Sequence, residues 1–430
     1  MKVIVMGAGV IGVASAWYLA KAGHEVVVLE RNAGAARETS FGNGGQISVS
    51  HAEPWANPSA PGKMLRWLGK EDAPLLFRLR ADPTQWSWGM KFLRECSARR
   101  STHNMIQLVR LGTYSRESLQ ALRVEAGVEY DHLERGILHY YTSAKEFDLA
   151  IEPARIMREI GCERRVIDAD EVVRIEPALA QIRSQLAGAT YTSADESGDV
   201  HKFTTGLAAR CAERGVQFRY GVRIQRLHAE GGRMLGVEYA DETGAYQVEK
   251  ADAYVLALGS FSPQLARTAG VALDIYPVKG YSITLPVLEP ALAPTASLTD
   301  DEFKLVFSRF GDRLRVAGTA EFDGYSMALN RVRCEAIVQR TLQVFPGLSR
   351  AELAQHWTGL RPATPGNVPY IGRSKVEGLY LNTGHGTLGW THGCGSGRAI
   401  ADIIDGRRPD CDFAFCGLPE RKPTLSVAAA

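Results

Sequence analysis

The beginning of the chain alternates between two continuous apolar runs and a stretch with helical spacing. Residues 2–6 are mostly β-branched, which is typical of a strand buried on both faces of a parallel sheet. Small and apolar residues then recur at helical intervals until Gly23, and residues 25–29 form the second run. The pattern predicts a strand, a helix and a second parallel strand.

The loop between the first predicted strand and the helix is rich in glycine. It consists of Gly7, Ala8, Gly9, Val10, Ile11 and Gly12. Gly7 permits a tight turn, Gly9 lets the backbone approach a pyrophosphate, and Gly12 allows close packing of the helix on the strand. Backbone N–H groups at the start of the helix can then bind phosphate oxygens. In this context the loop predicts a dinucleotide-binding site.

An acidic and a basic residue follow the second strand. Glu30 stands where a carboxylate can accept hydrogen bonds from both ribose hydroxyls, and the same charge would repel a 2′-phosphate. NADP is therefore disfavoured. Arg31 is adjacent, and we assign it to the same cofactor site. The loop alone does not separate FAD from NAD, so an NAD-dependent alcohol dehydrogenase is an alternative at this point.

Two further patterns predict strands later in the chain. Residues 253–258 are apolar and lead into Gly259, as expected for another buried strand. Residues 305–309 and 313–317 alternate apolar and polar side chains on either side of a Gly-Asp turn. This arrangement predicts an antiparallel hairpin, and hence a second sheet outside the nucleotide-binding fold.

Composition narrows the class of protein. A chain of 430 residues is long enough for two hydrophobic cores, and a net charge of +2 without dense basic runs gives no reason to expect nucleic acid as a partner. The 7 cysteines are scattered without metal-binding or redox spacing, so we expect reduced thiols, no metal site and a cytoplasmic location. The N-terminal residues lack a signal-peptide core, and no apolar run of about 18 residues predicts a spanning helix.

Several sequence blocks are similar to one family of flavoenzymes. They are residues 12–19, 45–48, 276–282, 357–362 and 381–391. In these blocks and in their order the chain resembles the DadA family of D-amino acid dehydrogenases, within the superfamily of D-amino acid oxidase and glycine oxidase. The resemblance runs nearly end to end. It implies an FAD cofactor and the oxidation of a small amino acid.

The resemblance also implies which further residues contact FAD. One segment would run past the pyrophosphate toward the isoalloxazine ring and contains Thr39, Ser40, Gly45, Gln46, Ile47 and Ser48. A second would lie against the pyrimidine edge of the flavin and contains Gly384, His385, Gly386, Thr387, Leu388 and Gly389. Ile224 and Gly259 would lie in segments that contact the adenine and pyrophosphate through the backbone. The residues agree independently with the second segment: the glycine spacing, at positions 384, 386, 389, 393, 395 and 397, indicates a bare backbone that enters a helix at about Ser396, and the N-terminus of that helix would face the negative charge of reduced flavin.

These assignments imply an α/β fold with two parts. A discontinuous Rossmann-type FAD-binding domain would consist of residues 1–50, 197–272 and 355–420. An antiparallel-sheet substrate domain of the D-amino acid oxidase and glycine oxidase type would consist of residues 51–196 and 273–354. Residues 421–430 would form a flexible tail.

Amino-acid oxidation by a flavin needs a cation that holds the substrate carboxylate while the Cα–H points at flavin N5. We predict Arg309 as this anchor, because it ends a hairpin strand where the superfamily commonly presents a bidentate arginine. Tyr281 and His51 are further pocket candidates, and Arg361 is a candidate for contact with either the substrate or the flavin, because it lies in a block that the superfamily uses near the flavin. No motif of a hydrolase, metalloprotease or nucleotide triphosphatase occurs in the sequence. The expected reaction is oxidative deamination to a 2-oxo acid and ammonia.

The sequence does not decide between several electron acceptors, or whether the protein contacts a membrane. The family's link to respiratory quinones favours a quinone, with a carrier protein or O₂ as the alternatives. Residues 55–100 combine tryptophans, basic residues and prolines, which fits either a cap on the substrate domain or peripheral contact with the inner face of the cytoplasmic membrane. Two other functions also remain open: oxidation of a secondary or cyclic amine such as a proline derivative, sarcosine or iminodiacetate, and a flavin subunit that only transfers electrons.

Overall fold

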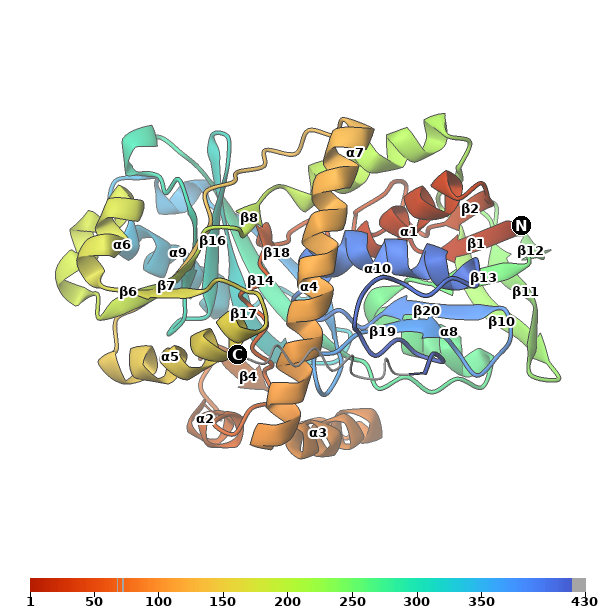
Figure 1. Ribbon diagram of the computed structural model, residues 1–430, viewed down its shortest axis with the longest axis horizontal. Coiled ribbons are helices and arrows are strands. Elements are labelled where there is room, and N and C mark those ends of the chain that lie inside the picture. The colour runs from red at the N-terminus through yellow and green to blue at the C-terminus, as the bar shows by residue number, and fades with distance from the viewer. Residues whose placement is uncertain (68, 72, 420–430) are drawn as a thin grey trace, which may run out of the picture.

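The computed structural model describes residues 1–419 apart from residues 68 and 72, and it has two lobes (Figure 1). The tail expected at residues 421–430 lies outside the described residues. The N-terminus and the smaller strands lie in the right lobe of Figure 1, and the larger sheet lies in the left lobe. The long helix α4 (Ala98–Ala126) crosses the view between them.

The first lobe is built around a six-stranded sheet. Its strands, in spatial order, are β19 (Tyr370–Arg373), β20 (Leu379–Thr383), β13 (Ala253–Leu256), β1 (Lys2–Met6), β2 (Glu25–Leu29) and β9 (Gln217–Arg219). All neighbours pair in parallel except β19 with β20. The predicted strand, helix and strand at the start of the chain are confirmed, with the helix at α1 (Val10–Lys21).

Both faces of this sheet are covered, which explains the continuous apolar runs. Val3 and Val5 of β1 pack in one core with apolar residues of α1, α4, α7 (Val200–Glu213) and α10 (Gly389–Ile404). Ile4 and Met6 pack on the opposite side, against α8 (Ser262–Thr268) and a separate antiparallel sheet. That sheet contains β10 (Arg223–Glu230), β11 (Arg233–Ala240) and β12 (Tyr246–Glu249).

The second lobe contains a nine-stranded, mostly antiparallel sheet. Its main path is β18 (Gln355–Ala363), β14 (Tyr276–Pro286), β17 (Arg313–Phe322), β16 (Leu305–Phe310), β15 (Ser297–Asp300), β5 (Ile137–Tyr141), β7 (Gly188–Thr192) and β6 (Arg165–Ile167), and β4 (Leu75–Phe77) pairs with β17. The predicted hairpin of β16 and β17 is confirmed. β18 pairs with β14 in this sheet, although the expected domain boundary at residue 355 places it with the nucleotide-binding part.

The remaining elements surround the two lobes. The helices are α2 (Ala60–Trp67), α3 (Pro83–Glu95), α5 (Ala144–Glu159), α6 (Ala169–Ile175) and α9 (Arg331–Val344). Short 3-10 helices span Pro177–Gln185, Gly259–Phe261, Pro290–Leu292 and Ala351–Leu353, and β3 (Gln46–Ile47) pairs with β8 (Glu196–Ser197). Within the described part of the chain, none of the helices has the length and apolar character needed to cross a bilayer.

Candidate active site

Two adjoining cavities extend from the six-stranded sheet to the nine-stranded one. The cavity of about 780 Å³ lies over the C-terminal ends of β1, β2 and β13, and we call it the dinucleotide cavity. The cavity of about 310 Å³ is lined by strands of the large sheet, and we call it the substrate cavity. Thr39, Asn43 and Gly386 line both, so the two spaces meet there. A parallel sheet presents a ligand crevice at this end of its strands.

The glycines of the first loop have different structural roles. Gly7 has a φ of +104°, and a Cβ there would lie 2.7 Å from the carbonyl oxygen of Ala257. A Cβ on Gly12 would lie 1.9 Å from the carbonyl oxygen of Gly7, so Gly12 is required by the fold itself. A Cβ on Gly9 would meet only Ser40 Oγ, at 3.7 Å. Gly9 therefore keeps space free on the cavity side, where a pyrophosphate would lie.

The start of α1 faces this space, because Gly9, Val10 and Ile11 line it. Gly9 is the N-cap of α1, makes no side-chain cap, and no acidic residue stands in the first turn. Val10 N–H donates to Ser40 Oγ at 3.2 Å, which brings the segment after β2 over the loop. Thr39 Oγ1 donates to the carbonyl oxygen of Leu360. This arrangement fits a bound phosphate group, because a helix N-terminus attracts anions.

Glu30 is held at the end of β2 by backbone donors. Its carboxylate accepts hydrogen bonds from Ala8 N–H at 2.9 Å and from Asn32 N–H at 2.8 Å. Arg31 pairs with Glu38 and lies over the Phe261 ring, with its Cζ 4.0 Å from the ring centroid. All of these side chains except Ala8 line the dinucleotide cavity.

The loop before α10 closes the other side of the same cavity. Gly384 and Gly386 have φ values of +84° and +55°, which allow the chain to turn sharply before it enters α10. His385 is 3% exposed, its Nε2 has no hydrogen-bond partner among the described residues, and burial holds its pKa well below the usual range. A buried, unpartnered ring nitrogen beside a cavity fits contact with a ligand.

The helix after this loop begins earlier than the sequence predicts. α10 starts at Gly389, whereas the glycine spacing indicated a start near Ser396. The later glycines serve helix packing instead. A Cβ on Gly395 would lie 2.6 Å from Ser115 Cα of α4, and a Cβ on Gly397 would lie 2.7 Å from the carbonyl carbon of Ala14 in α1. Small residues let the three helices approach closely.

The other residues assigned to the cofactor divide between the cavities. Ile224, Gly259 and Gly389 line the dinucleotide cavity, whereas Gln46, Ser48, Thr387 and Leu388 line the substrate cavity. Five assigned residues do not line either space: Ala8, Gly12, Gly45, Ile47 and Gly384. A Cβ on Gly45 would lie 2.3 Å from the Phe310 ring, so this glycine brings β3 close to the large sheet.

Arg361 of β18 lines the substrate cavity without a carboxylate partner among the described residues. Its Nη1 donates to the carbonyl oxygen of Thr319 at 2.7 Å, and its Nη2 to that of Gly318 at 3.3 Å. A Cβ on Gly280 would lie 2.3 Å from Arg361 Cζ, so the guanidinium rests on bare backbone. Burial, assisted by the positive charge of Arg333, lowers the pKa of Arg361 to about 10. A buried cation without a counter-ion favours an anionic ligand.

Arg309 does not line the substrate cavity, and this corrects the choice of the carboxylate anchor. Its Nε donates to the carbonyl oxygen of Gly311 at 3.0 Å, and its Nη1 donates to that of Pro290. The guanidinium thus closes its own hairpin turn at the surface. β16 alternates its side chains between two faces, and Arg309 belongs to the face that does not reach the cavity.

Tyr281 lines the cavity but its hydroxyl is already engaged. The hydroxyl donates to Glu321, whose carboxylate also lies 3.4 Å from Lys279 Nζ. Burial, followed by the bond to Glu321, raises the pKa of Tyr281. The phenol hydroxyl therefore belongs to a buried polar network with Glu321 and Lys279.

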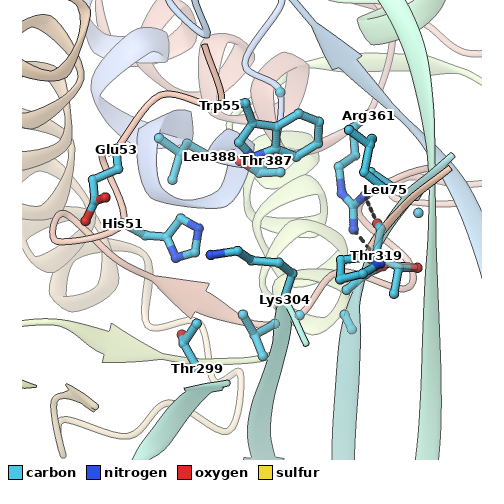
Figure 2. Close-up of a pocket in the computed structure, with 18 of the residues that line it drawn as sticks. His51, Glu53, Trp55, Leu75, Thr299, Lys304, Thr319, Arg361, Thr387 and Leu388 are labelled. Carbon is cyan, nitrogen blue, oxygen red and sulfur yellow. Dashed lines mark hydrogen bonds between the residues drawn. The ribbon is translucent and has the colours of Figure 1, made fainter. Parts of the chain in front are cut away.

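His51 stands in the substrate cavity near residues that sequence reasoning missed. Figure 2 shows its ring facing the end of the Lys304 side chain. Neither Lys304 nor Asp301 belongs to a recognisable motif, because both stand in the irregular connection between β15 and β16. Thr319 was also missed. Its only indication was the preceding Gly318, since an isolated glycine in a strand often marks a bulge.

Comparisons with known proteins agree with this architecture. Residues 2–403 match the model of the DAO family, described as FAD dependent oxidoreductase. The D-amino acid dehydrogenase of Dechloromonas aromatica (strain RCB) is 56% identical over 415 residues, which cover 96% of this chain and 99% of that protein. The D-amino acid dehydrogenase of Paramagnetospirillum magneticum (strain ATCC 700264 / AMB-1) is 53% identical, with 95% and 96% covered.

Solved structures share the fold at low sequence identity. L-proline dehydrogenase from P. horikoshii has a TM-score of 0.73 and 18% identity, with 94% of each chain covered. Glycine oxidase from Geobacillus kaustophilus has a TM-score of 0.73 and 21% identity, with 96% of each chain covered. The predicted fold class, a Rossmann-type FAD-binding part with an antiparallel-sheet part, is therefore confirmed.

Proposed function

This chain belongs to the DAO family of FAD dependent oxidoreductases, and from that membership we propose that it oxidises D-amino acids to 2-oxo acids and ammonia. Support for this substrate class comes from relatives named D-amino acid dehydrogenase, one of them 56% identical over nearly the whole chain. The structural observation that carries the proposal is Arg361, a cation that faces the substrate cavity without a carboxylate partner among the described residues.

Arg361 holds the α-carboxylate of the amino acid in this proposal. Two backbone carbonyls fix one side of the guanidinium, and the flat backbone at Gly280 supports its face. The remaining N–H donors can bind a carboxylate through charge-assisted hydrogen bonds. Fixing the carboxylate fixes Cα relative to the junction of the two cavities, which is the positioning that the reaction needs.

Bound FAD supplies the acceptor for the two electrons and the hydrogen that leave Cα. The protein supplies the surroundings: Trp55 and Leu75 form apolar walls of the substrate cavity, and the loop at Thr387 and Leu388 closes it where it meets the dinucleotide cavity (Figure 2). Apolar walls limit access of water to the reacting carbon. The imino acid that leaves is hydrolysed by water to the 2-oxo acid and ammonia.

Anaerobic reduction of the purified flavoprotein tests this function directly. D-alanine and other D-amino acids should bleach the flavin absorbance, whereas the L-enantiomers should leave it largely unchanged. Bleaching by proline derivatives, sarcosine or iminodiacetate but not by D-amino acids would favour oxidation of a secondary or cyclic amine. A protein that binds FAD but is reduced by none of these compounds would instead be an electron-transfer subunit.

We further propose a membrane quinone as the electron acceptor. The cap formed by α2, α3 and the segment between them, at the bottom of Figure 1, has several exposed apolar side chains: Leu65 (77%), Leu79 (63%), Trp86 (54%), Met90 (58%) and Leu93 (47%). Basic residues lie among them in the sequence, and such a mixture is suited to an anionic lipid surface. The substrate cavity extends to Met64 and Trp67 of α2, beneath the same cap.

Flotation with vesicles of anionic lipid tests the membrane contact. Leu65→Ser combined with Trp86→Ser should abolish flotation and slow reduction of a vesicle-bound quinone, while turnover with a soluble dye stays unchanged. Val248→Ser is the matched control, because Val248 of β12 is 55% exposed in the opposite lobe. Equal flotation of the double variant and the wild type would contradict this docking face.

A further inference from the structure

The substrate cavity contains a second polar cluster, separate from Arg361. Figure 2 shows the Lys304 side chain extending into the cavity toward His51, while Arg361 lies apart from both. The Lys304 side chain is 45% exposed, although residues of the cavity surround it. Asp301 and His139 also line the cavity at this end. The proposed reaction at Cα uses none of these side chains.

The backbone that presents Lys304 is held in an unfavourable conformation. Lys304 and Thr319 have φ values of +53° and +52°, a region that side chains other than glycine rarely adopt. The two are coupled, because Thr319 N–H donates to the carbonyl oxygen of Lys304 at 3.3 Å. A Cβ on Gly318 would lie 2.2 Å from the same oxygen. Such strain persists where the surrounding structure imposes it, and it concentrates at functional sites.

A shift in the strand register accompanies this strain. Lys279 and Tyr281 of β14 face Glu321 and Gly318 of β17, so β17 carries one extra residue between the pairs. Bulges of this kind redirect side chains next to binding sites. Here the bulge turns the carbonyl oxygen of Thr319 toward Arg361 and leaves Thr319 N–H bonded to Lys304. The same irregular stretch of β17 thus hydrogen-bonds to the side chain of Arg361 and to the backbone of Lys304.

The charges at the Lys304 end of the cavity are balanced. Lys304 Nζ lies 2.7 Å from Asp301 Oδ1, and Arg164 Nη1 lies 2.7 Å from Glu53 Oε1. The other oxygen of Asp301 is 3.0 Å from His139 Nδ1. An ionised side chain of a substrate would meet one like charge for each opposite one. It would lose its hydration without a net electrostatic gain.

Hydrogen-bonding capacity nevertheless remains at this end. The ammonium of Lys304 has three protons and donates one to Asp301. His51 Nδ1 and His139 Nε2 are buried and have no hydrogen-bond partner among the described residues, and His139 is only 2% exposed. The two rings lie 5.3 Å apart by their centroids. Unpartnered polar atoms of this kind in a cavity wall indicate that a group of the ligand supplies their missing hydrogen bonds.

We propose that Lys304, with His51 and His139, forms a subsite that selects substrates with an uncharged, hydrogen-bond-accepting side chain, namely a hydroxyl or a carboxamide. This inference rests on the proposed oxidation of D-amino acids and names the preferred class among them. Arg361 fixes the α-carboxylate, and the Lys304 ammonium donates to the side-chain oxygen.

Three D-amino acids of nearly equal shape test the subsite: D-asparagine, D-aspartate and D-leucine. The wild-type holoenzyme should oxidise D-asparagine with a higher kcat/KM than either of the others. Lys304→Met keeps a stem of the same length. Methionine, like lysine, is not a glycine, so the energetic cost of the positive φ at this position is unchanged. It should lower kcat/KM for D-asparagine by about ten- to 150-fold, with the value for D-leucine changed by less than about threefold.

Two further variants keep this test interpretable. Arg309→Met, on the strand that Lys304 precedes but outside the cavity, is the matched control and should change neither substrate. Asp301→Asn combined with Lys304→Met removes both charges of the pair, so no buried carboxylate loses its partner. Flavin content and the melting temperature verify that each variant is folded, and the double variant should show the same selective loss as Lys304→Met.

The possible results separate this inference from the proposed function. If D-aspartate or D-leucine is the best of the three wild-type substrates, or if Lys304→Met slows all three equally, the subsite is wrong while D-amino acid oxidation stands. If no D-amino acid reduces the wild-type flavin, the proposed function itself has failed, and the inference fails with it.

Discussion

Replacement of Arg361 by methionine is the sharpest perturbation of the proposed site. Methionine keeps much of the apolar stem and removes the guanidinium, which binds the backbone at Thr319 and Gly318 and faces the substrate cavity. The residue does not line the dinucleotide cavity, so FAD content should remain normal. The loss should therefore fall on the substrate and not on the cofactor.

The expected magnitude follows from the bonds that the guanidinium can make. A hydrogen bond to a charged group contributes about 1.5–3 kcal/mol, which corresponds to roughly a ten- to 150-fold loss in kcat/KM. Arg361→Lys should recover only part of this, because an ammonium cannot reproduce the planar pair of donors. Gly280→Ala should also raise KM, since the new Cβ would displace the guanidinium, which it would approach to 2.3 Å.

Anaerobic stopped-flow reduction with D-alanine provides the assay, and Arg309→Met is the control. Arg309 bonds to its own hairpin turn, so its loss should leave kcat/KM within about twofold of the wild type. The reasoning would be refuted if Arg361→Met retained wild-type kcat/KM with full flavin content. A loss of kcat/KM in Arg309→Met alone would instead support Arg309 as the carboxylate anchor, as the sequence predicts.

Three further predictions concern the cofactor loop and acid stability. Gly12→Ala should destabilise the fold by about 1–3 kcal/mol in urea unfolding, because its Cβ would lie 1.9 Å from a carbonyl oxygen, whereas Gly9→Ala should fold normally and bind FAD more than about tenfold more weakly. Equal stability of the two variants would contradict this division. Glu30→Gln should weaken FAD binding to the apoprotein by fluorescence titration without changing kcat at saturating FAD, and an unchanged affinity would mean that the ribose lies elsewhere. Burial lowers the pKa of His392 to about 3 from 6.5, so the folded state excludes a proton that the unfolded chain binds between those values, and stability falls as pH drops through this window. The free energy of unfolding of His392→Gln should therefore fall by about 2 kcal/mol less than that of the wild type between pH 7 and pH 5. Urea unfolding at both pH values measures this, and an equal decrease in the two proteins would contradict the prediction.

The sequence by itself determined the elements whose residues are close together along the chain. The first strand, the glycine loop and the second strand follow each other within one unit, and the requirement for Gly7 and Gly12 is set by contacts inside it. The hairpin of β16 and β17 is equally local. Short-range sterics and apolar periodicity are sufficient for such elements.

The tertiary structure decided which side chains share a cavity. Arg309 and Arg361 both stand on strands of the large sheet, and only the register between β14 and β18 places Arg361 over Gly280. The glycines of α10 looked like a flavin loop, but their spacing serves packing on α1 and α4.

Lys304 and His51 come together from segments far apart in the sequence, and a bulge in β17 helps to direct Lys304 into the cavity. The sequence around Lys304 carries no local mark of this placement, because the hydrogen bond from Thr319 N–H to the Lys304 carbonyl oxygen joins segments that meet only in the folded sheet.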